Sequence, residues 1–215
     1  MSESRGASRT LLRDAEQRSP AAGWSSPRIP MRTSRQSARL VAIALGLGLV
    51  AILGGCRSTH PPLEVVDEVD LDRYVGRWYE IASFPQRFQQ GCVATTATYT
   101  FREDGCVRVE NECRDGAFDA DLRRVEGVTW VTDPNGSQAK LKVQFFWPFR
   151  GDYWIIELDP EYRYAVVGHP SRNYLWILSR TPTLDPAVYE TLLARIEAQG
   201  YDLERLNRTP QPPAP

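Results

Sequence analysis

Apolar and polar residues alternate in short stretches from about residue 77 to residue 180, and turn residues separate these stretches. In one of them Leu141, Val143 and Phe145 are apolar, whereas the residues between them are polar. Because successive side chains of a strand point to opposite faces, this pattern predicts strands with one face in a core. Asp104-Gly105, between two such stretches, is typical of a hairpin turn. The pattern predicts eight strands, at residues 77–84, 93–101, 106–112, 123–132, 139–145, 153–158, 164–168 and 173–180.

The connections between these strands are too short to contain a crossover helix, so we expect the strands to pair antiparallel. An antiparallel series of this length either splits into a sandwich or closes into a barrel without free edges. After the last strand a helix is predicted, with Asp185 as its N-cap, Pro186 as its first residue and Gly200 beyond its end. A single amphipathic helix is expected to pack on the outside of the strands. Its apolar face consists of Val188, Leu192, Leu193 and Ile196.

The front of the chain has the features of a targeting segment. Residues 1–30 are polar and rich in Ser, Arg, Pro and Gly, and we interpret them as a disordered or untranslated extension. From Met31 the sequence has the three parts of a secretory signal, which are a basic head, an apolar centre and small residues at the end. The small residues are followed directly by Cys56, and Leu-Gly-Gly-Cys resembles the lipobox of bacterial lipoproteins, in which this cysteine becomes the acylated N-terminus. Residues 31–55 are therefore interpreted as a lipoprotein signal peptide and Cys56 as a lipid anchor in the membrane; the alternative is a secreted protein with an incidental cysteine.

This interpretation divides the mature chain into three parts. Residues 56–64 are expected to form a tether, residues 65–209 the folded domain, and residues 210–215 a loose tail. The residue after the anchor is Arg57 and not the aspartate that marks inner-membrane retention in well-studied bacteria. The expected location is therefore the bacterial outer membrane, on its periplasmic side.

The net charge of −1 conceals an uneven distribution. Residues 1–56 hold 8 of the 26 Lys and Arg and 3 of the 27 Asp and Glu, which leaves 18 basic and 24 acidic residues in the rest. A nucleic-acid surface would show a basic patch or stripe. We therefore expect no nucleic-acid partner.

The sequence offers little for catalysis. Its two histidines are His60, in the expected tether, and His169, in a turn before a proline. Two separated histidines without a cysteine or carboxylate cluster do not make a metal site, and a glycine-rich phosphate loop is absent from the sequence. We therefore predict that the protein is not an enzyme and uses no cofactor or metal.

One pair of residues is predicted to join the two ends of the strand series. Gly76 opens the first strand, Trp78 follows it, and Arg180 ends the last strand. A guanidinium stacked on an indole contributes roughly 0.5–2 kcal/mol, and a glycine allows the backbone to turn or approach another segment closely. We predict that Arg180 stacks on Trp78. The alternative is that Trp78 is one core aromatic among many and Arg180 is a solvated strand end.

Three cysteines remain after Cys56, in a compartment that permits disulfides. Cys106 and Cys113 lie on one strand, seven residues or roughly 23 Å apart, and so cannot pair with each other. Cys92 precedes the strand that pairs with theirs, and Cys113 lies close to its level. A bridge between Cys92 and Cys113 is therefore predicted, with a bulge needed to align them, and Cys106 is left free.

Together, Gly76-x-Trp78, the Leu158-Asp159-Pro160 turn, Arg180 at the end of the eighth strand and a single following helix resemble the lipocalins. The resemblance is greatest to the bacterial outer-membrane lipocalins related to apolipoprotein D, although the middle lipocalin motif usually reads Thr-Asp-Tyr. It implies an all-β fold, an eight-stranded antiparallel up-and-down barrel with one C-terminal helix packed outside. The Trp78 and Arg180 pair would close one end, and a cavity for a fatty acid or lysophospholipid would open at the other. The implied roles are lipid storage, salvage or transport.

The aromatic residues of the late strands are the candidate ligand contacts, and Trp176 is the strongest of them, because it shares one strand face with Leu178 and Arg180. Arg150 is placed to meet a lipid carboxylate or phosphate. The alternative for the aromatics is a solidly filled core. Two other functions compete with lipid binding: a lipoprotein that acts structurally or through a protein partner, with a possible homodimer, and an enzyme on the same barrel. The predicted ligand contacts are Trp176, Trp147, Phe145, Phe149, Tyr153, Tyr99 and Arg150.

Overall fold

A computed structural model of the chain describes residues 60–213, and the predicted extension, signal peptide and Cys56 anchor lie outside the described residues. Residues 58–215 form one compact unit. Its strands are β1 (Gly76–Ser83), β2 (Cys92–Phe101), β3 (Val107–Asp115), β4 (Leu122–Val131), β5 (Lys140–Gln144), β6 (Gly151–Leu158), β7 (Tyr164–Gly168), β8 (Leu175–Ser179) and β9 (Asn207–Arg208). Its helices are α2 (Leu71–Tyr74) and α3 (Pro186–Ala198), with 3-10 turns η2 (Arg87–Gln89) and η3 (Leu203–Arg205).

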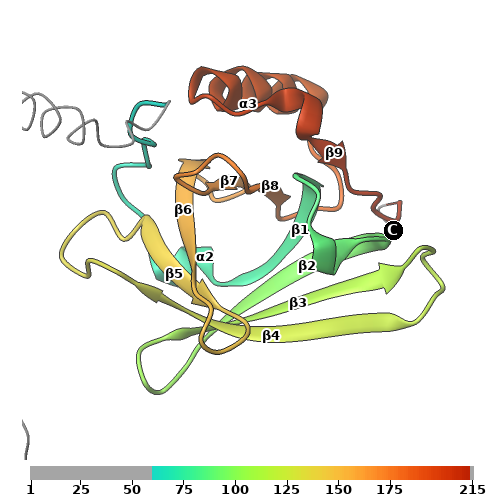
Figure 1. Cartoon of the computed structure of the whole chain (residues 1–215), viewed down its shortest axis with the longest axis horizontal. Helices are drawn as coiled ribbons and strands as arrows, with labels where there is room; N and C mark the ends of the chain where they lie inside the picture. Colours follow the sequence, from blue (N-terminus) through green and yellow to red (C-terminus); the bar gives the residue numbers. More distant parts are fainter. Residues whose placement is uncertain (1–59, 214–215) are drawn as a thin grey trace, which may run out of the picture. The chain divides into compact units, whose positions relative to one another are not determined.

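The strands form a closed barrel (Figure 1). Each strand from β2 to β8 pairs antiparallel with the next, and β1 pairs with both β8 and β2, which joins the two ends of the series. The short strand β9 adds to β1 from outside the series. The predicted eight-stranded antiparallel barrel is therefore confirmed, with one extra strand.

The two ends of the barrel differ. The turns that join β2 to β3, β4 to β5 and β6 to β7 lie at one end together with α2, and we call this the closed end. Asp70 caps α2 by accepting hydrogen bonds from the backbone N–H groups of Asp72 and Arg73. The loops at the opposite end, which we call the open end, are residues 84–91, 116–121, 145–150 and 169–174.

Two apolar cores hold the barrel. The first lies inside it toward the closed end, and its buried members include Trp78, Val109 and Leu141. The second lies outside, between α3 and the strands β1, β6, β7 and β8, and includes Leu192 and Ile196 of the helix. The helix is confirmed where it was predicted, and within residues 60–213 no helix has the length and apolar character to cross a membrane.

The end of α3 and its start follow the predicted signals. Asp185 accepts hydrogen bonds from the backbone of Ala187 and Val188, and Pro186 is the first helical residue. The buried face contains Tyr189 besides Leu192 and Ile196, whereas Val188 and Leu193 are only partly buried. The predicted face is therefore the buried one: Tyr189 lies within it, and Val188 and Leu193 lie at its two edges and still pack against the outer core.

The segments before and after the barrel are more ordered than the sequence suggests. Within the expected tether, Leu63 is buried in the outer core, and the Pro61 carbonyl accepts a hydrogen bond from the Arg172 guanidinium. Within the expected loose tail, the Gln211 side chain donates to two backbone carbonyls of β1 and β2. The tail is held because β1 and β2 stop pairing beyond Tyr79, and the residues after η3 fill the resulting gap.

The structure joins Cys92 to Cys113 by a disulfide and leaves Cys106 as a free thiol. The register between β2 and β3 shifts after Val93, where Ala94 adopts a left-handed backbone conformation with φ of 52°. The predicted bulge is therefore present beside the bridge. Cys92 lies opposite Asp115, so the two cysteines are joined across a diagonal, with their Cα atoms 5.4 Å apart.

We predict that Cys113→Ser lowers the free energy of unfolding by about 3 kcal/mol, since the bridge closes a loop of 21 residues. Urea unfolding of residues 58–215 measures this change, and addition of a reductant to the wild type should reproduce it. Cys106→Ser is the matched control and should change the stability by less than about 1 kcal/mol. Equal effects of the two substitutions would contradict a structural role for the bridge.

Candidate ligand-binding cavity

The floor of the barrel is an indole covered by a guanidinium. Trp78 is fully buried, and the guanidinium carbon of Arg180 lies 3.8 Å from the centroid of its ring. The indole Nε1 donates a hydrogen bond of 2.8 Å to the carbonyl of Tyr74, at the end of α2. The first and last strands are therefore joined to α2 at one point.

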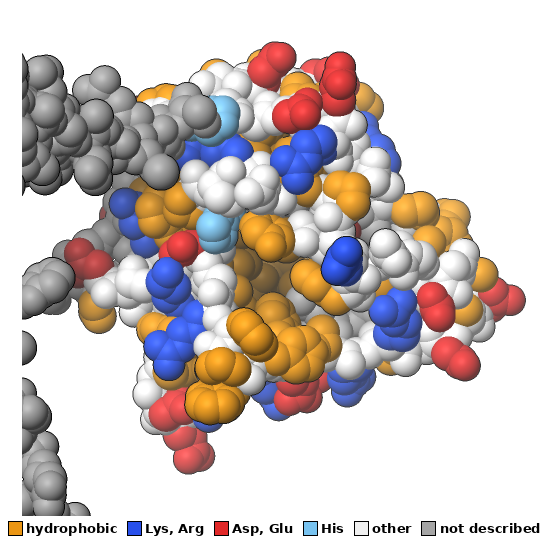
Figure 2. Space-filling view, in the orientation of Figure 1, with side chains coloured by type: hydrophobic (Ala, Val, Ile, Leu, Met, Phe, Trp, Pro, Cys, Tyr) orange, Lys and Arg blue, Asp and Glu red, His pale blue; other side chains and the backbone are white. Residues whose placement is uncertain are grey.

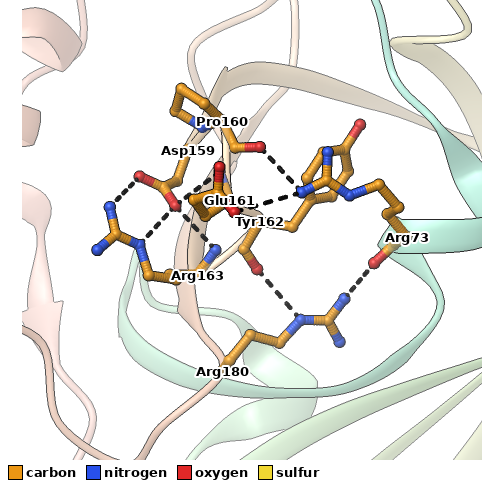
Figure 3. Close-up of polar contacts among 7 residues, drawn as sticks. All are labelled: Arg73, Asp159, Pro160, Glu161, Tyr162, Arg163 and Arg180. Atoms are coloured by element: carbon orange, nitrogen blue, oxygen red, sulfur yellow. Dashed lines mark hydrogen bonds and ion pairs between the residues drawn. The ribbon is translucent and has the colours of Figure 1, made fainter.

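The Arg180 guanidinium also donates hydrogen bonds to several backbone carbonyl groups around the floor. Its Nε is 3.3 Å from the Tyr162 carbonyl, and Figure 3 shows this contact together with the one to the Arg73 carbonyl. In all, its Nη1 and Nη2 donate to four carbonyls of the segment before and within β1. Burial lowers the pKa of Arg180 from its ordinary value, but a guanidinium stays charged at neutral pH. These four acceptors are the carbonyls of Arg73, Tyr74, Val75 and Arg77, at 2.7, 3.1, 3.0 and 2.9 Å.

Gly76 makes this close approach possible. Its φ of +96° is a conformation that side chains rarely adopt, and a Cβ at this position would lie 3.2 Å from Nη1 of Arg180. The glycine therefore serves both the turn into β1 and the seat of the guanidinium.

The turn between β6 and β7 is also held at the closed end by hydrogen bonds. The buried carboxylate of Asp159 accepts hydrogen bonds from the backbone of Glu161 and Arg163 and two more from the Arg163 guanidinium (Figure 3). Hydrogen bonding by Arg163 holds the pKa of Asp159 below its ordinary value. The Pro160 carbonyl accepts from Arg73, so the unusual Leu-Asp-Pro sequence still connects this turn to α2.

Above the floor the barrel is hollow. A cavity of about 380 Å³ opens toward the open end, and Figure 2 shows hydrophobic side chains gathered around a hollow in this face. This volume falls within the range of about 300–1,000 Å³ that is usual for small-molecule sites. The sequence alternative of a solidly filled core is therefore wrong.

Three tyrosines form a cluster at the lower end of the cavity, and two of them, Tyr99 and Tyr153, line it. The Tyr153 hydroxyl is 2.8 Å from the hydroxyl of Tyr74 and 2.9 Å from that of Tyr99. Burial raises the pKa of Tyr99 to about 12 and raises the pKa values of Tyr74 and Tyr153 as well. The phenols therefore remain neutral, and their mutual hydrogen bonds leave rings and not unpaired hydroxyls facing the cavity.

The wall also contains one buried carboxylate, two residues above Trp78 on the inner face of β1. Glu80 accepts hydrogen bonds from Ser83, Gln89 and Thr209, and its side chain is almost wholly buried. Its place at mid-depth makes this level of the cavity unfavourable for a second anion.

The structure brings most of the predicted ligand contacts to this cavity. Six of them line it, and the seventh, Trp147, does not. Trp147 is 84% exposed, at the tip of the loop between β5 and β6. The six residues in the lining are Trp176, Phe145, Phe149, Tyr153, Tyr99 and Arg150.

Several lining residues were not identified from the sequence. Glu80 is two residues after Trp78 and so shares its strand face, which is a signal that it points inward. We did not identify it because a charged residue is expected to point outward. Phe88 and Tyr174 come from loops, where no periodicity shows direction. Tyr74, which completes the tyrosine cluster, precedes the first strand. Among residues 60–213 no group of three or more His, Cys, Asp and Glu could hold a metal ion.

The comparisons with known proteins agree with this geometry. Residues 69–211 match the model of the lipocalin-like domain family. The chain belongs to the lipocalin family. It is 44% identical over 163 residues to temperature-induced lipocalin-1 of Arabidopsis thaliana, with 71% of this chain and 85% of that protein covered.

A bacterial lipocalin is similarly related. The outer membrane lipoprotein Blc of Citrobacter freundii is 41% identical over 182 residues, with 82% of this chain and 99% of that protein covered. Among solved structures, insecticyanin of the tobacco hornworm Manduca sexta superposes with a TM-score of 0.55 at 20% identity, covering 71% of this chain and 86% of that one. This structural likeness shows the shared fold, and the resemblance inferred from the sequence motifs is confirmed.

We predict that Arg180→Met lowers the free energy of unfolding by about 3 kcal/mol, because it removes the indole contact and leaves buried carbonyls without donors. Arg108→Met, on the exposed face of β3, is the matched control and should have an effect below about 0.5 kcal/mol. Urea unfolding at neutral pH compares them. Effects of similar size would support the alternative that Arg180 is a solvated strand end.

We also predict that Asp159 contributes to the acid sensitivity of this lipocalin. Because its pKa is lower in the folded state than in the unfolded state, its contribution is present above the unfolded pKa and is lost as the pH falls through the folded pKa. The stability of the wild type should therefore fall more steeply below about pH 4 than that of Asp159→Asn. Asp119→Asn, in an exposed loop, should keep the steep slope. Parallel slopes for the wild type and Asp159→Asn would contradict this assignment.

Proposed function

We propose that this lipocalin binds one fatty acid or lysophospholipid in its barrel for lipid storage, salvage or transport at the cell envelope. The observation that carries the proposal is the blind apolar cavity above Trp78, which is sealed at the floor and open at the other end. A single acyl chain fits such a shape because it buries its length while its polar head stays near water.

The charges of the wall set the direction of the ligand. Glu80 lies at mid-depth, whereas Arg150 precedes β6 at the open end. An anionic carboxylate or phosphate is repelled by the first and attracted by the second, and the Asp152 carboxylate, which also lines the cavity, is paired with Lys142. The ligand therefore binds with its chain toward Trp78 and its head beside Arg150.

Trp176 contributes the central apolar contact. Its indole lies in the lining on β8, and its Nε1 is 3.5 Å from the side-chain oxygen of Gln89. The ring lies toward the open end of the cavity, where it stacks on Tyr174, and it shares its strand face with Leu178, which also lines the cavity. An acyl chain that fills the cavity packs against both side chains.

The proposed location is the bacterial outer membrane, with an acyl anchor on Cys56. The support is the Leu-Gly-Gly-Cys sequence and the similarity to a protein named an outer membrane lipoprotein. We propose binding and not catalysis as the function.

Calorimetric titration of residues 58–215 tests the cavity, because this unit contains every described strand pairing and both apolar cores and so is expected to fold by itself. Palmitate and a palmitoyl lysophospholipid are the probes. We expect saturable binding of one ligand per chain, and a loss of about tenfold in affinity for Trp176→Ala, since an aromatic contact is removed.

The matched control is Trp154→Phe, because Trp154 is on β6 but packs against the outer core. It should bind both probes with wild-type affinity. A flat titration of the wild-type protein would contradict the proposal and favour a lipoprotein that acts structurally or through a protein partner, including a second copy of itself.

A further inference from the structure

The open end of the barrel exposes an unusual set of aromatic side chains. The loop between β5 and β6 presents Phe146, Trp147 and Phe149, which are 66%, 84% and 76% exposed. Phe88 and Tyr174 are exposed in the two flanking loops. Clustered apolar side chains at one site on a soluble domain mark a contact surface. We call these five side chains the aromatic rim.

The rim is held in place by the backbone. Phe149 donates a backbone hydrogen bond of 2.8 Å to the Phe146 carbonyl, which closes a turn with Trp147 at its tip. The Gln144 side chain reaches the Phe149 carbonyl from the end of β5. The structure therefore displays the Trp147 ring outward from a closed turn, and the ring does not fold back over the cavity.

The charges around the rim favour an anionic partner. The loops 84–91, 145–150 and 169–174, which carry the rim, contain no Asp or Glu, although acidic residues outnumber basic ones in residues 57–215. Arg87 and Arg150 are exposed in the first two of these loops. The fourth loop of the open end, residues 116–121, is acidic and lies outside the rim.

The position of Pro61, near the start of the described residues, also favours an anionic lipid partner. The Pro61 carbonyl accepts a hydrogen bond from the guanidinium of Arg172, which belongs to the loop 169–174 at the open end. Only four residues lie between Cys56 and Pro61, and the five steps from one to the other span about 18 Å at most in a fully extended chain. If Cys56 carries the proposed acyl anchor, the open end is held close to the lipid surface.

We propose that the aromatic rim docks on an anionic lipid bilayer, with the mouth of the cavity against the membrane. Trp and Tyr rings favour the interface between lipid and water, because one part of the ring is apolar and another is polar. Arginines beside them attract anionic headgroups, each by a modest and salt-dependent amount. A docked mouth passes a single-chain lipid between bilayer and cavity without exposing its chain to water.

Flotation of residues 58–215 with vesicles of phosphatidylethanolamine and phosphatidylglycerol tests this proposal without the anchor. We expect binding that weakens as salt is added or phosphatidylglycerol is omitted. Trp147→Ser should weaken the partitioning by about tenfold, and addition of Phe146→Ser should weaken it further. The matched control is Phe101→Ser, because Phe101 is 45% exposed at the closed end. It should bind vesicles like the wild type.

Brominated lipids locate the contact. They should quench the wild-type fluorescence on binding, and this quenching should fall in Trp147→Phe although that variant still floats with the vesicles. Equal flotation of the wild type and the Trp147 and Phe146 variants would overturn the proposal. So would a stable dimer that these substitutions dissociate, since a second copy would then be the occupant of the rim. Neither result depends on the calorimetric titration, so failure of docking and failure of lipid binding in the cavity are distinguishable.

Discussion

The hydrogen bonds and indole contact of Arg180 are the constraint on which the barrel depends. Its guanidinium stacks on Trp78 and binds carbonyls from the segment that leads into β1, and a further contact reaches the β6–β7 turn through Tyr162. Carbonyl groups buried without donors cost free energy, and a guanidinium has five N–H groups in a fixed plane. One side chain therefore closes the floor and aligns the first strand with the last.

The cavity follows from the asymmetry of the two ends. At the closed end, α2, the Asp159 turn and the tyrosine cluster fill the space between the strands. At the open end, the connecting loops stay around the rim of the cavity and do not fill its centre, which leaves the hollow seen in Figure 2. The barrel is open at one end because side chains fill the space between the strands only at the other end, which leaves room for a ligand.

The sequence predicted what periodicity and local signals determine. Alternation located all eight strands to within about three residues, and Asp185 located the start of α3. The direction of loop side chains has no such signal, which is why Trp147 was placed in the cavity and is in fact exposed. Gln211 was placed in a loose tail because it is held by side-chain hydrogen bonds to backbone carbonyls of β1 and β2, and no apolar pattern in the sequence reveals such contacts.

The central claim is that this lipocalin carries one single-chain lipid in the cavity above Trp78. Native mass spectrometry of the protein purified from a bacterial envelope tests it most directly. The account predicts a folded species heavier than the chain by one fatty acid or lysophospholipid, released on unfolding. A folded chain that remains without lipid, even after incubation with an excess of both lipid classes, would contradict it.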